Sequence, residues 1–258
     1  MHPILNIAIR IAVQGGNKII QAYDKKIYDN KKNKKILIQI INKSKNIIFN
    51  LIKKSYPKHK IIINNSLISL KKFINPTWVI NILHGKKNFI KRFPNFCISI
   101  AIFIKKKICI SVIYDPLKNE LFTSVSGKGS QVNGYRMRSS KNYLLKNSFF
   151  STKINNVFIN KNIIFIKILN KIFKKKVIFR SNNLLPLDLA YLADGRIDFI
   201  LDFNFKIKNY YSGLLQVQES GGVISDYLGG CNYEKNIVII ANNLKLMRLI
   251  ISEINSIF

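Results

Sequence analysis

Three short apolar segments follow one another between residues 96 and 126, and they restrict the possible folds of this chain more than any other feature. Short runs rich in β-branched and aromatic residues, bounded by turn residues, are typical of β-strands. Lysines separate the first two segments, and a turn sequence from Pro116 to Asn119 separates the last two. We therefore expect an antiparallel meander, followed by a tight hairpin turn at Asn133-Gly134. The three segments are residues 96–104, 108–114 and 120–125.

Helix and strand patterns alternate on both sides of the meander. Before it, apolar residues recur at helical spacing over residues 4–22 and, after a Lys/Asn-rich stretch (24–35), again up to about Lys54. Short strands are expected at residues 60–63 and 78–80. The second half combines expected helices at 186–194, 211–220 and after Asn243 with expected strands at 198–202, 223–226 and 237–241.

This order of elements predicts a layered α/β (α+β) fold, with an antiparallel N-terminal sheet and a smaller C-terminal α/β half. The chain has 258 residues, and 48% of them are hydrophobic, which is enough for a globular protein with a large core. No internal repeat or clear linker divides the sequence. We expect a single domain over residues 1–258, with subdomains of roughly 1–145 and 146–258.

The formal net charge is +31, from 43 Lys and Arg residues against 12 Asp and Glu residues. A charge of this sign and size is typical of proteins that bind nucleic acids or anionic membranes. A second explanation stays open, because the abundant Lys, Ile and Asn residues have A/T-rich codons that accumulate through genome-wide drift. Whatever its origin, the charge predicts weak, salt-sensitive binding to RNA or DNA.

Cysteine spacing and the N-terminal residues indicate a soluble, cytoplasmic protein without a membrane segment. Cys97, Cys109 and Cys231 show neither metal nor disulfide spacing, which fits a reducing cytosol. Residues 1–10 lack the pattern of a signal peptide. The most apolar stretch, residues 96–104, ends at three lysines and is too short to span a bilayer.

Acidic residues are distributed unevenly, and residues 30–114 contain none of them. Among those that remain, Asp188 and Asp194 face different ways on an expected helix, and Asp198 and Asp202 are about 13 Å apart along an expected strand. We expect these four carboxylates to support helices and to solvate the surface rather than to hold an ion. No Walker-type phosphate loop, serine-hydrolase elbow or zinc-protease motif occurs, and Gly127-Lys128-Gly129 indicates a turn more than a phosphate cradle.

A motif in the acid-free segment resembles a known phosphatase signature. Residues 78–89 are Trp-Val-Ile-Asn-Ile-Leu-His-Gly-Lys-Lys-Asn-Phe, which resembles the Trp-x-x-Asp-Pro-x-Asp-Gly-Thr-Thr-Asn-Phe motif of the inositol monophosphatase family. The resemblance covers nearly the whole chain and is strongest to bacterial members that act as transcription antitermination (Nus) factors. It implies the layered αβαβα fold of the sugar phosphatases. Further matches at the family's spacing are Phe93-Pro94, Tyr114-Asp115-Pro116, Asn119-Glu120-Leu121-Phe122, Gly127-Lys128-Gly129, Leu187-Asp188-Leu189-Ala190-Tyr191, Gly195-Arg196-Ile197-Asp198 and Glu219-Ser220-Gly221-Gly222.

The resemblance also implies the position of a metal site, and the chain departs from the family there. Family members hold two or three Mg²⁺ ions with carboxylates, which activate a water and neutralise the phosphate. In this chain, three amides and an imidazole stand at the ligand positions and carry no negative charge. Lys86 and Lys87 add positive charge beside them. We therefore expect no bound metal or other cofactor and no catalytic residue. The degenerate ligand positions are Asn64, Asn81, His84 and Asn209.

A substrate pocket is implied as well, and it would be vestigial in this chain. Asp202 stands where the family has a Glu that contacts substrate hydroxyls, whereas Arg180 fits either a phosphate ligand or an arginine at the edge of the core. His84 is interpreted as a surface or cavity histidine rather than as a ligand for a softer metal. The expected pocket residues are Leu83, Gly85, Lys86, Lys87, Arg180 and Asp202.

Three functions stay open. The first is a non-catalytic interaction protein; the resemblance implies a homodimer in the processive complex that transcribes ribosomal RNA, binding Nus factors and RNA polymerase and helping nascent ribosomal RNA to fold. The alternative is a residual Mg²⁺-dependent inositol-1-monophosphatase, which would need neutral ligands to rescue metal binding. The third is a decaying gene product, although the intact pattern of core positions argues against it.

Overall fold

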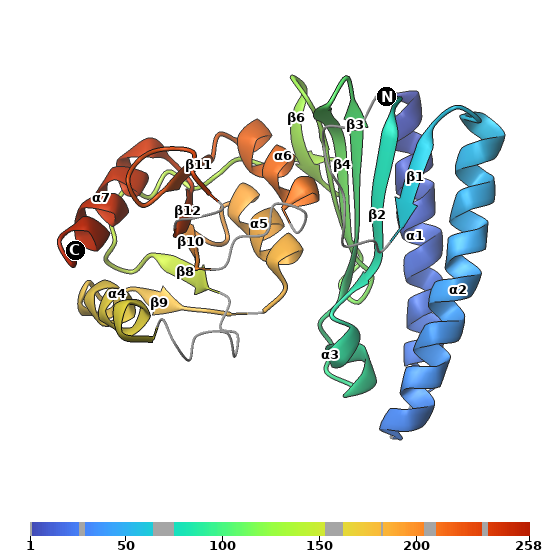
Figure 1. Ribbon diagram of the computed structural model, residues 1–258, viewed down its shortest axis with the longest axis horizontal. Coiled ribbons are helices and arrows are strands. Elements are labelled where there is room, and N and C mark those ends of the chain that lie inside the picture. The colour runs from blue at the N-terminus through green and yellow to red at the C-terminus, as the bar shows by residue number, and fades with distance from the viewer. Residues whose placement is uncertain are drawn as a thin grey trace.

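Layers of helices and sheets alternate through the molecule in the order αβαβα (Figure 1). The computed structural model describes residues 2–25, 29–63, 75–152, 162–181, 183–203, 210–233 and 237–258. The expected fold class, a layered α/β architecture, is confirmed.

The first layer consists of two long helices, α1 (Pro3–Tyr23) and α2 (Asn30–Ser55). Apolar residues of α1 at helical spacing, among them Ala8 and Ile11, are buried. Helix α2 begins earlier than the sequence indicated, because Asp29 accepts hydrogen bonds from the backbone N–H groups of Lys31 and Lys32 and caps the helix. The polar residues 30–35 therefore form the first turns of α2 instead of a connecting stretch.

The first sheet follows the order of the chain, β1 to β7, within the described residues. Strands β3, β4 and β5 form the expected antiparallel meander. The expectation of an antiparallel sheet is wrong at one edge, where β1 runs parallel to β2. The segment from Ile63 to Thr77 is long enough for the crossover that parallel neighbours require. The strands are β1 (Lys60–Ile63), β2 (Thr77–His84), β3 (Cys97–Ile104), β4 (Lys107–Asp115), β5 (Glu120–Val125), β6 (Gly129–Val132) and β7 (Tyr135–Arg136).

The expected hairpin turn at Asn133-Gly134 joins β6 to β7. Both residues have positive φ angles, 49° and 87°, as a two-residue turn of type I′ requires. A short helix, α3 (Lys86–Ile90), follows β2 directly.

The middle layer contains α5 (Leu185–Ala193) and α6 (Tyr211–Ser220), which lie between the two sheets (Figure 1). All residues of α5 are buried, as a helix covered on both sides must be. Gly213 allows α6 to approach α5 closely, because a Cβ atom there would lie 2.3 Å from Cδ1 of Leu189. Helix α6 ends at Gly221, whose φ angle is 96°, as its sequence predicted.

The second sheet has the order β11-β12-β10-β8-β9 within the described residues. Strand β8 pairs in parallel with both β9 and β10, whereas β12 is antiparallel to β10 and β11. Asn243 caps the last helix through a hydrogen bond from the backbone N–H of Leu246, as expected. The elements are β8 (Phe149–Thr152), α4 (Asn162–Lys174), β9 (Ile178–Phe179), β10 (Phe199–Asp202), β11 (Val223–Asp226), β12 (Val238–Ala241) and α7 (Leu244–Asn255).

One hydrophobic cluster joins the two halves of the chain. It contains Ile113 and Phe122 from the first sheet, Leu189 from α5, Val217 from α6 and Ile240 from the second sheet. The middle helices thus share a core with both sheets. In the part of the chain that the structure covers, no helix is long and apolar enough to cross a membrane.

Candidate functional site

The candidate site lies at the end of β2, where the strand leaves its regular pairing. Asn81 pairs with Ser99 of β3, but His84 pairs with Cys97, so β2 has one residue more than β3 over this interval. Such a bulge changes the direction of the side chains around it. It allows Asn81 and His84 to meet on one side of the strand.

Hydrogen bonds connect Asn81 to His84 and His84 to Ser99, and we call these three residues the β2-end cluster. Nδ2 of Asn81 lies 3.4 Å from Nδ1 of His84, and Nε2 of His84 lies 2.7 Å from Oγ of Ser99. The amide nitrogen can only donate, and in the tautomer in which Nδ1 of His84 accepts from it, Nε2 carries the proton and donates to Ser99. Oδ1 of Asn81 accepts from the backbone N–H of Leu83 at 3.2 Å.

Gly85 connects the β2-end cluster to α3 in a conformation that favours glycine. Its φ angle is 83°, and a Cβ atom would lie 2.7 Å from the backbone oxygen of Asn95. Nδ2 of Asn88 donates to the same oxygen at 2.8 Å. The first turn of α3 carries Lys86 and Lys87, both exposed, so two ammonium groups follow the cluster in the chain.

The other residues of the expected pocket occupy different places. Leu83 is buried in the core between the first sheet and α1, so its side chain does not line an open pocket. Arg180 is exposed directly after β9, and Asp202 is the buried last residue of β10. Because β8, β9 and β10 are parallel, Arg180 and Asp202 both lie where the C-terminal ends of these strands come together. Asn64 and Asn209 lie outside the described residues.

Asp202 is engaged in the interior of the protein. The hydroxyl of Tyr210 donates a hydrogen bond to Oδ2 of Asp202. Burial, and then the neighbouring carboxylate, raise the pKa of Tyr210 well above its usual range. The tyrosine therefore stays protonated and continues to donate to Asp202.

The expectation that the carboxylates of the second half solvate the surface is wrong for Asp188, Asp198 and Asp202, which are all buried. Asp198 accepts from the backbone N–H of Phe149 at 2.8 Å and from Nδ2 of Asn242 at 3.0 Å. Asp188, in the first turn of α5, accepts from Oγ of Ser151 at 3.0 Å. Buried carboxylates need hydrogen-bond donors. The donors here come from other parts of the fold, so each of these carboxylates connects its own element to a neighbouring one.

Most of the other described carboxylates hold backbone or cationic groups. Glu219 was missed as a structural residue: it accepts from the N–H groups of Gly127 and Gly129, at 2.8 and 2.9 Å, so these donors serve the turn rather than a phosphate. The remaining contacts are Asp29 with the start of α2, Asp115 with Leu117 and Lys118, Asp226 with Leu228, Gly230 and Asn232, Glu120 and Asp194 with Arg196, and Glu253 with Lys171 and Lys175.

No group of three or more His, Cys, Asp and Glu side chains that could hold a metal ion occurs among the residues for which the structure gives positions. The β2-end cluster offers one amide, one imidazole and one hydroxyl, none of which is an anionic ligand, and His84 is within hydrogen-bond distance of the other two. The carboxylates near the chain's other turns are bound to backbone N–H groups. The arrangement suits a rigid connection between β2, β3 and α3.

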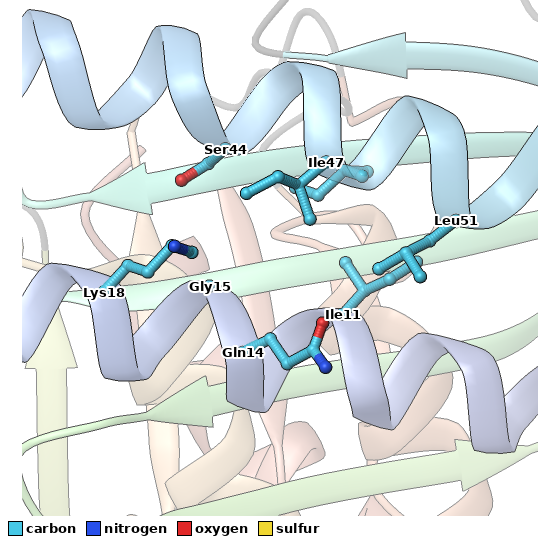
Figure 2. Close-up of a pocket in the computed structure, with 8 residues that line it drawn as sticks. Ile11, Gln14, Gly15, Lys18, Ser44, Ile47 and Leu51 are labelled. Atoms are coloured by element: carbon cyan, nitrogen blue, oxygen red, sulfur yellow. The ribbon is translucent and has the colours of Figure 1, made fainter.

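A small cavity lies away from the β2-end cluster, between α1 and α2 (Figure 2). Its volume is about 10 Å³, room for one water molecule at most. Ser44 of α2 points toward α1 in Figure 2, and its Oγ atom is buried without a hydrogen-bond partner in the protein. Gln14, Gly15 and Lys18 of α1 form the opposite wall.

Comparison with known families gives a full-length match. The sequence profile of the Inositol monophosphatase family matches residues 1–257. The match includes the β2 end, the buried α5 segment and the α6 terminus, where the motifs of the sequence lie.

Named relatives and solved structures agree with this match. Nus factor SuhB of Buchnera aphidicola subsp. Baizongia pistaciae is 44% identical over 264 residues, covering 100% of this chain and 98% of that protein. Nus factor SuhB of Escherichia coli (strain K12) is 36% identical over 255 residues, covering 98% and 96%. The crystal structure of extragenic suppressor protein suhB from Bartonella henselae superimposes with a TM-score of 0.82 at 26% identity, covering 98% of this chain and 100% of that one.

Proposed function

Because this chain belongs to the inositol monophosphatase family, as its motifs indicated, we propose that it uses the family fold as a non-catalytic Nus factor of the SuhB type. Relatives that carry the name Nus factor SuhB match it over nearly their whole length. In this role the protein is a component of the antitermination complex that transcribes ribosomal RNA.

The β2-end cluster carries the non-catalytic part of the proposal. Magnesium prefers hard, charged oxygen ligands, and two neighbouring Mg²⁺ ions need several carboxylates to balance their charge. Asn81 offers a neutral amide whose oxygen already accepts from Leu83, and both ring nitrogens of His84 face hydrogen-bond partners. The residues present do not fit a pair of dications, and we derive no metal-dependent step for this chain.

The described carboxylates do not compensate for this loss. Asp198, Asp202 and Glu219 are each bound to donors of the fold itself. They stand at separate places in the fold, Asp198 directly before β10, Asp202 at its last residue and Glu219 beside the turn of Gly127 and Gly129, and the described residues bring no three such groups together. These contacts also support a maintained fold rather than a decaying product, since the acids that remain are used in the structure.

The fold then serves to bind partners rather than to catalyse a reaction. The proposed partners are Nus factors, RNA polymerase and nascent ribosomal RNA, and the proposed state is a cytoplasmic homodimer. The net charge of +31 supports contact with RNA, because a phosphate backbone attracts cationic surfaces and releases bound counterions. The names of the relatives support the transcription machinery as the setting.

Two measurements test the proposal together. The purified protein should associate with Nus proteins and RNA polymerase in a pull-down, and chelation of Mg²⁺ should leave the association of the protein itself with the Nus proteins unchanged. Titration with MgCl₂ in a calorimeter should give no saturable heat, and inositol 1-phosphate should release no phosphate at high Mg²⁺.

The opposite results separate the alternatives. Absence of any association with the Nus proteins and polymerase contradicts the interaction role. Phosphate release that disappears in a His84→Ala variant, with an unchanged thermal transition, would instead establish the residual phosphatase.

A further inference from the structure

Helix α2 carries an unusual concentration of positive charge. Its 26 residues include eight lysines and no acidic residue. At about 1.5 Å per residue, the helix is roughly 39 Å long. It is therefore long enough to contact an extended chain of anionic groups along its whole axis.

Six of the eight lysines of α2 are exposed: Lys31, Lys32, Lys34, Lys35, Lys43 and Lys54. Leu37, Ile48 and Ile52 are buried against the rest of the first layer. Lys31, Lys35, Asn42, Asn46 and Phe49 recur at helical spacing on the opposite side, and all are exposed. Figure 1 shows α2 as the outermost helix at one end of the molecule, so nothing in the described structure covers this side.

Asp29 caps the first turn of α2, and no acidic residue follows it within the helix. The ion pairs in the described part of the chain use Lys171, Lys175 and Arg196, none of which belongs to α2. Helix α1, the neighbour of α2, has no acidic residue either. At the far end of the molecule, by contrast, Glu253 of α7 pairs with Lys171 and Lys175. The field of α2 is therefore uncompensated over most of its length.

An aromatic ring stands among the lysines. Phe49 is 48% exposed, and Nζ of Lys53 lies 5.9 Å from its ring centre. A ring beside cationic groups is the usual arrangement for single-stranded nucleic acid, where an unpaired base stacks on the ring and lysines contact phosphates. Insertion into a membrane would need a broad apolar face, but amides and lysines surround Phe49 and Ile38 here.

We propose that the outer face of α2, defined by Lys31, Lys35, Lys43 and Phe49, binds single-stranded RNA. The lysines contact phosphates along the strand, and the ring of Phe49 stacks against a base. This inference rests on the proposed role in transcription, and it assigns the surface on which the protein meets the transcript.

The test uses the full chain and a fluorescently labelled oligouridylate of about 20 nucleotides, long enough to follow the helix. Anisotropy titrations at several salt concentrations compare the wild type with Lys31→Gln/Lys35→Gln/Lys43→Gln. A matched control, Lys167→Gln/Lys174→Gln/Lys176→Gln, removes the same charge from exposed positions of α4 and the turn after it. Circular dichroism and the Tm verify that both variants are folded.

The α2 variant should bind at least about tenfold more weakly at 0.1 M salt, and its slope of log K against log salt should fall by about 2, since three phosphate contacts are lost. The control should stay within about twofold of the wild type. Phe49→Leu should weaken binding at least about fivefold and leave the salt slope unchanged, because stacking releases no counterions.

An equal loss of RNA affinity in the two triple variants would overturn the proposal. It would show that RNA binds through the overall charge of the protein and not at the face of α2. Tighter binding of phosphatidylserine vesicles than of RNA, lost in the α2 variant, would assign the face to a membrane instead. The pull-down with Nus proteins distinguishes failure of this surface from failure of the proposed function. An α2 variant that binds RNA normally and still associates with the Nus proteins contradicts only the RNA-binding surface. A wild type that does not associate contradicts the proposed function.

Discussion

Asn242 and Asp198 are joined by two hydrogen bonds, one between side chains and one between backbone atoms. Nδ2 of Asn242 donates to Oδ1 of Asp198 at 3.0 Å, and the backbone N–H of Asn242 donates to the carbonyl of Asp198, also at 3.0 Å. The second carboxylate oxygen accepts from the N–H of Phe149. One buried side chain thus connects β8, β10 and the residue that follows β12.

Replacement of Asn242 by alanine should therefore destabilise the protein. The buried carboxylate would lose a donor and keep the N–H of Phe149, and a hydrogen bond to a charged group contributes about 1.5–3 kcal/mol. Urea denaturation measures the change in the free energy of unfolding. Asn46→Ala, on the exposed side of α2, is the control and should stay within about 0.5 kcal/mol of the wild type. Similar values for the two variants would show that the Asp198 contact contributes nothing.

Gly85→Ala should be costly for two reasons. The positive φ angle penalises any Cβ atom by about 1–2 kcal/mol, and the backbone oxygen of Asn95 would lie only 2.7 Å from it. We expect a total loss of about 3 kcal/mol, with a loosened α3. Gly127→Ala has the same backbone penalty but no atom within 4 Å of the new Cβ, so its loss should be near 1 kcal/mol. Thermal denaturation of both variants gives the difference, and equal losses would contradict the close contact.

Asp115 should make stability depend on pH in the direction opposite to that of a salt-bridged carboxylate. Burial raises the pKa of Asp115, although hydrogen bonds from the N–H groups of Lys118 and Leu117 lower it in part. Between the unfolded and the raised folded pKa, the folded state binds more protons, so stability from this group falls as pH rises. Ionisation of the Asp115 carboxyl group therefore destabilises the folded protein.

Asp115→Asn keeps an oxygen for the two N–H donors and removes the ionisation. The variant should have a higher Tm than the wild type at neutral pH, and this advantage should shrink as the pH falls through the raised pKa. Tm measurements across the acidic range follow both proteins. An advantage that grows on acidification would mean that the folded state lowers the pKa of Asp115 instead.

Ser44→Ala should stabilise the first layer. Oγ of Ser44 is buried at the cavity of Figure 2 without a partner in the protein, and such a group costs about 1–3 kcal/mol. We expect a gain of about 1 kcal/mol in the free energy of unfolding. Ser252→Ala, at an exposed position of α7, measures the effect of helix propensity alone. A loss of stability at Ser44 but not at Ser252 would show that a water molecule in the cavity satisfies the hydroxyl.

Local signals predicted the elements that local chemistry determines. Asn133-Gly134 specified its hairpin because two consecutive positive φ angles are hard for other residues, and Gly221 specified the end of α6 in the same way. The start of α2 was missed because lysines and asparagines suggested a connection, while the capping carboxylate of Asp29 was not recognised. The parallel pairing of β1 also has no local signal, since it depends on where a later strand returns.

The sequence predicted which positions form the candidate site, but it did not predict the contacts between their side chains. The motif indicated Asn81 and His84 together, and the structure joins them. Ser99 completes the cluster from the neighbouring strand, and only the register of β2 on β3 places it there. Asp198 was expected at the surface because its partners are distant in the chain: Phe149 is 49 residues away and Asn242 is 44 residues away.

The position of α5 and α6 between the two sheets has a consequence for synthesis on the ribosome. Cys97, Ile113 and Phe122 belong to strands that are translated first, yet they are covered by helices that are translated much later. Until Ser220 has left the exit tunnel, one face of the early sheet stays apolar and uncovered, a state that favours aggregation of nascent chains. A fragment that stops before α5 would keep that face permanently, so the N-terminal sheet needs the later helices before it can exist as a stable, soluble structure.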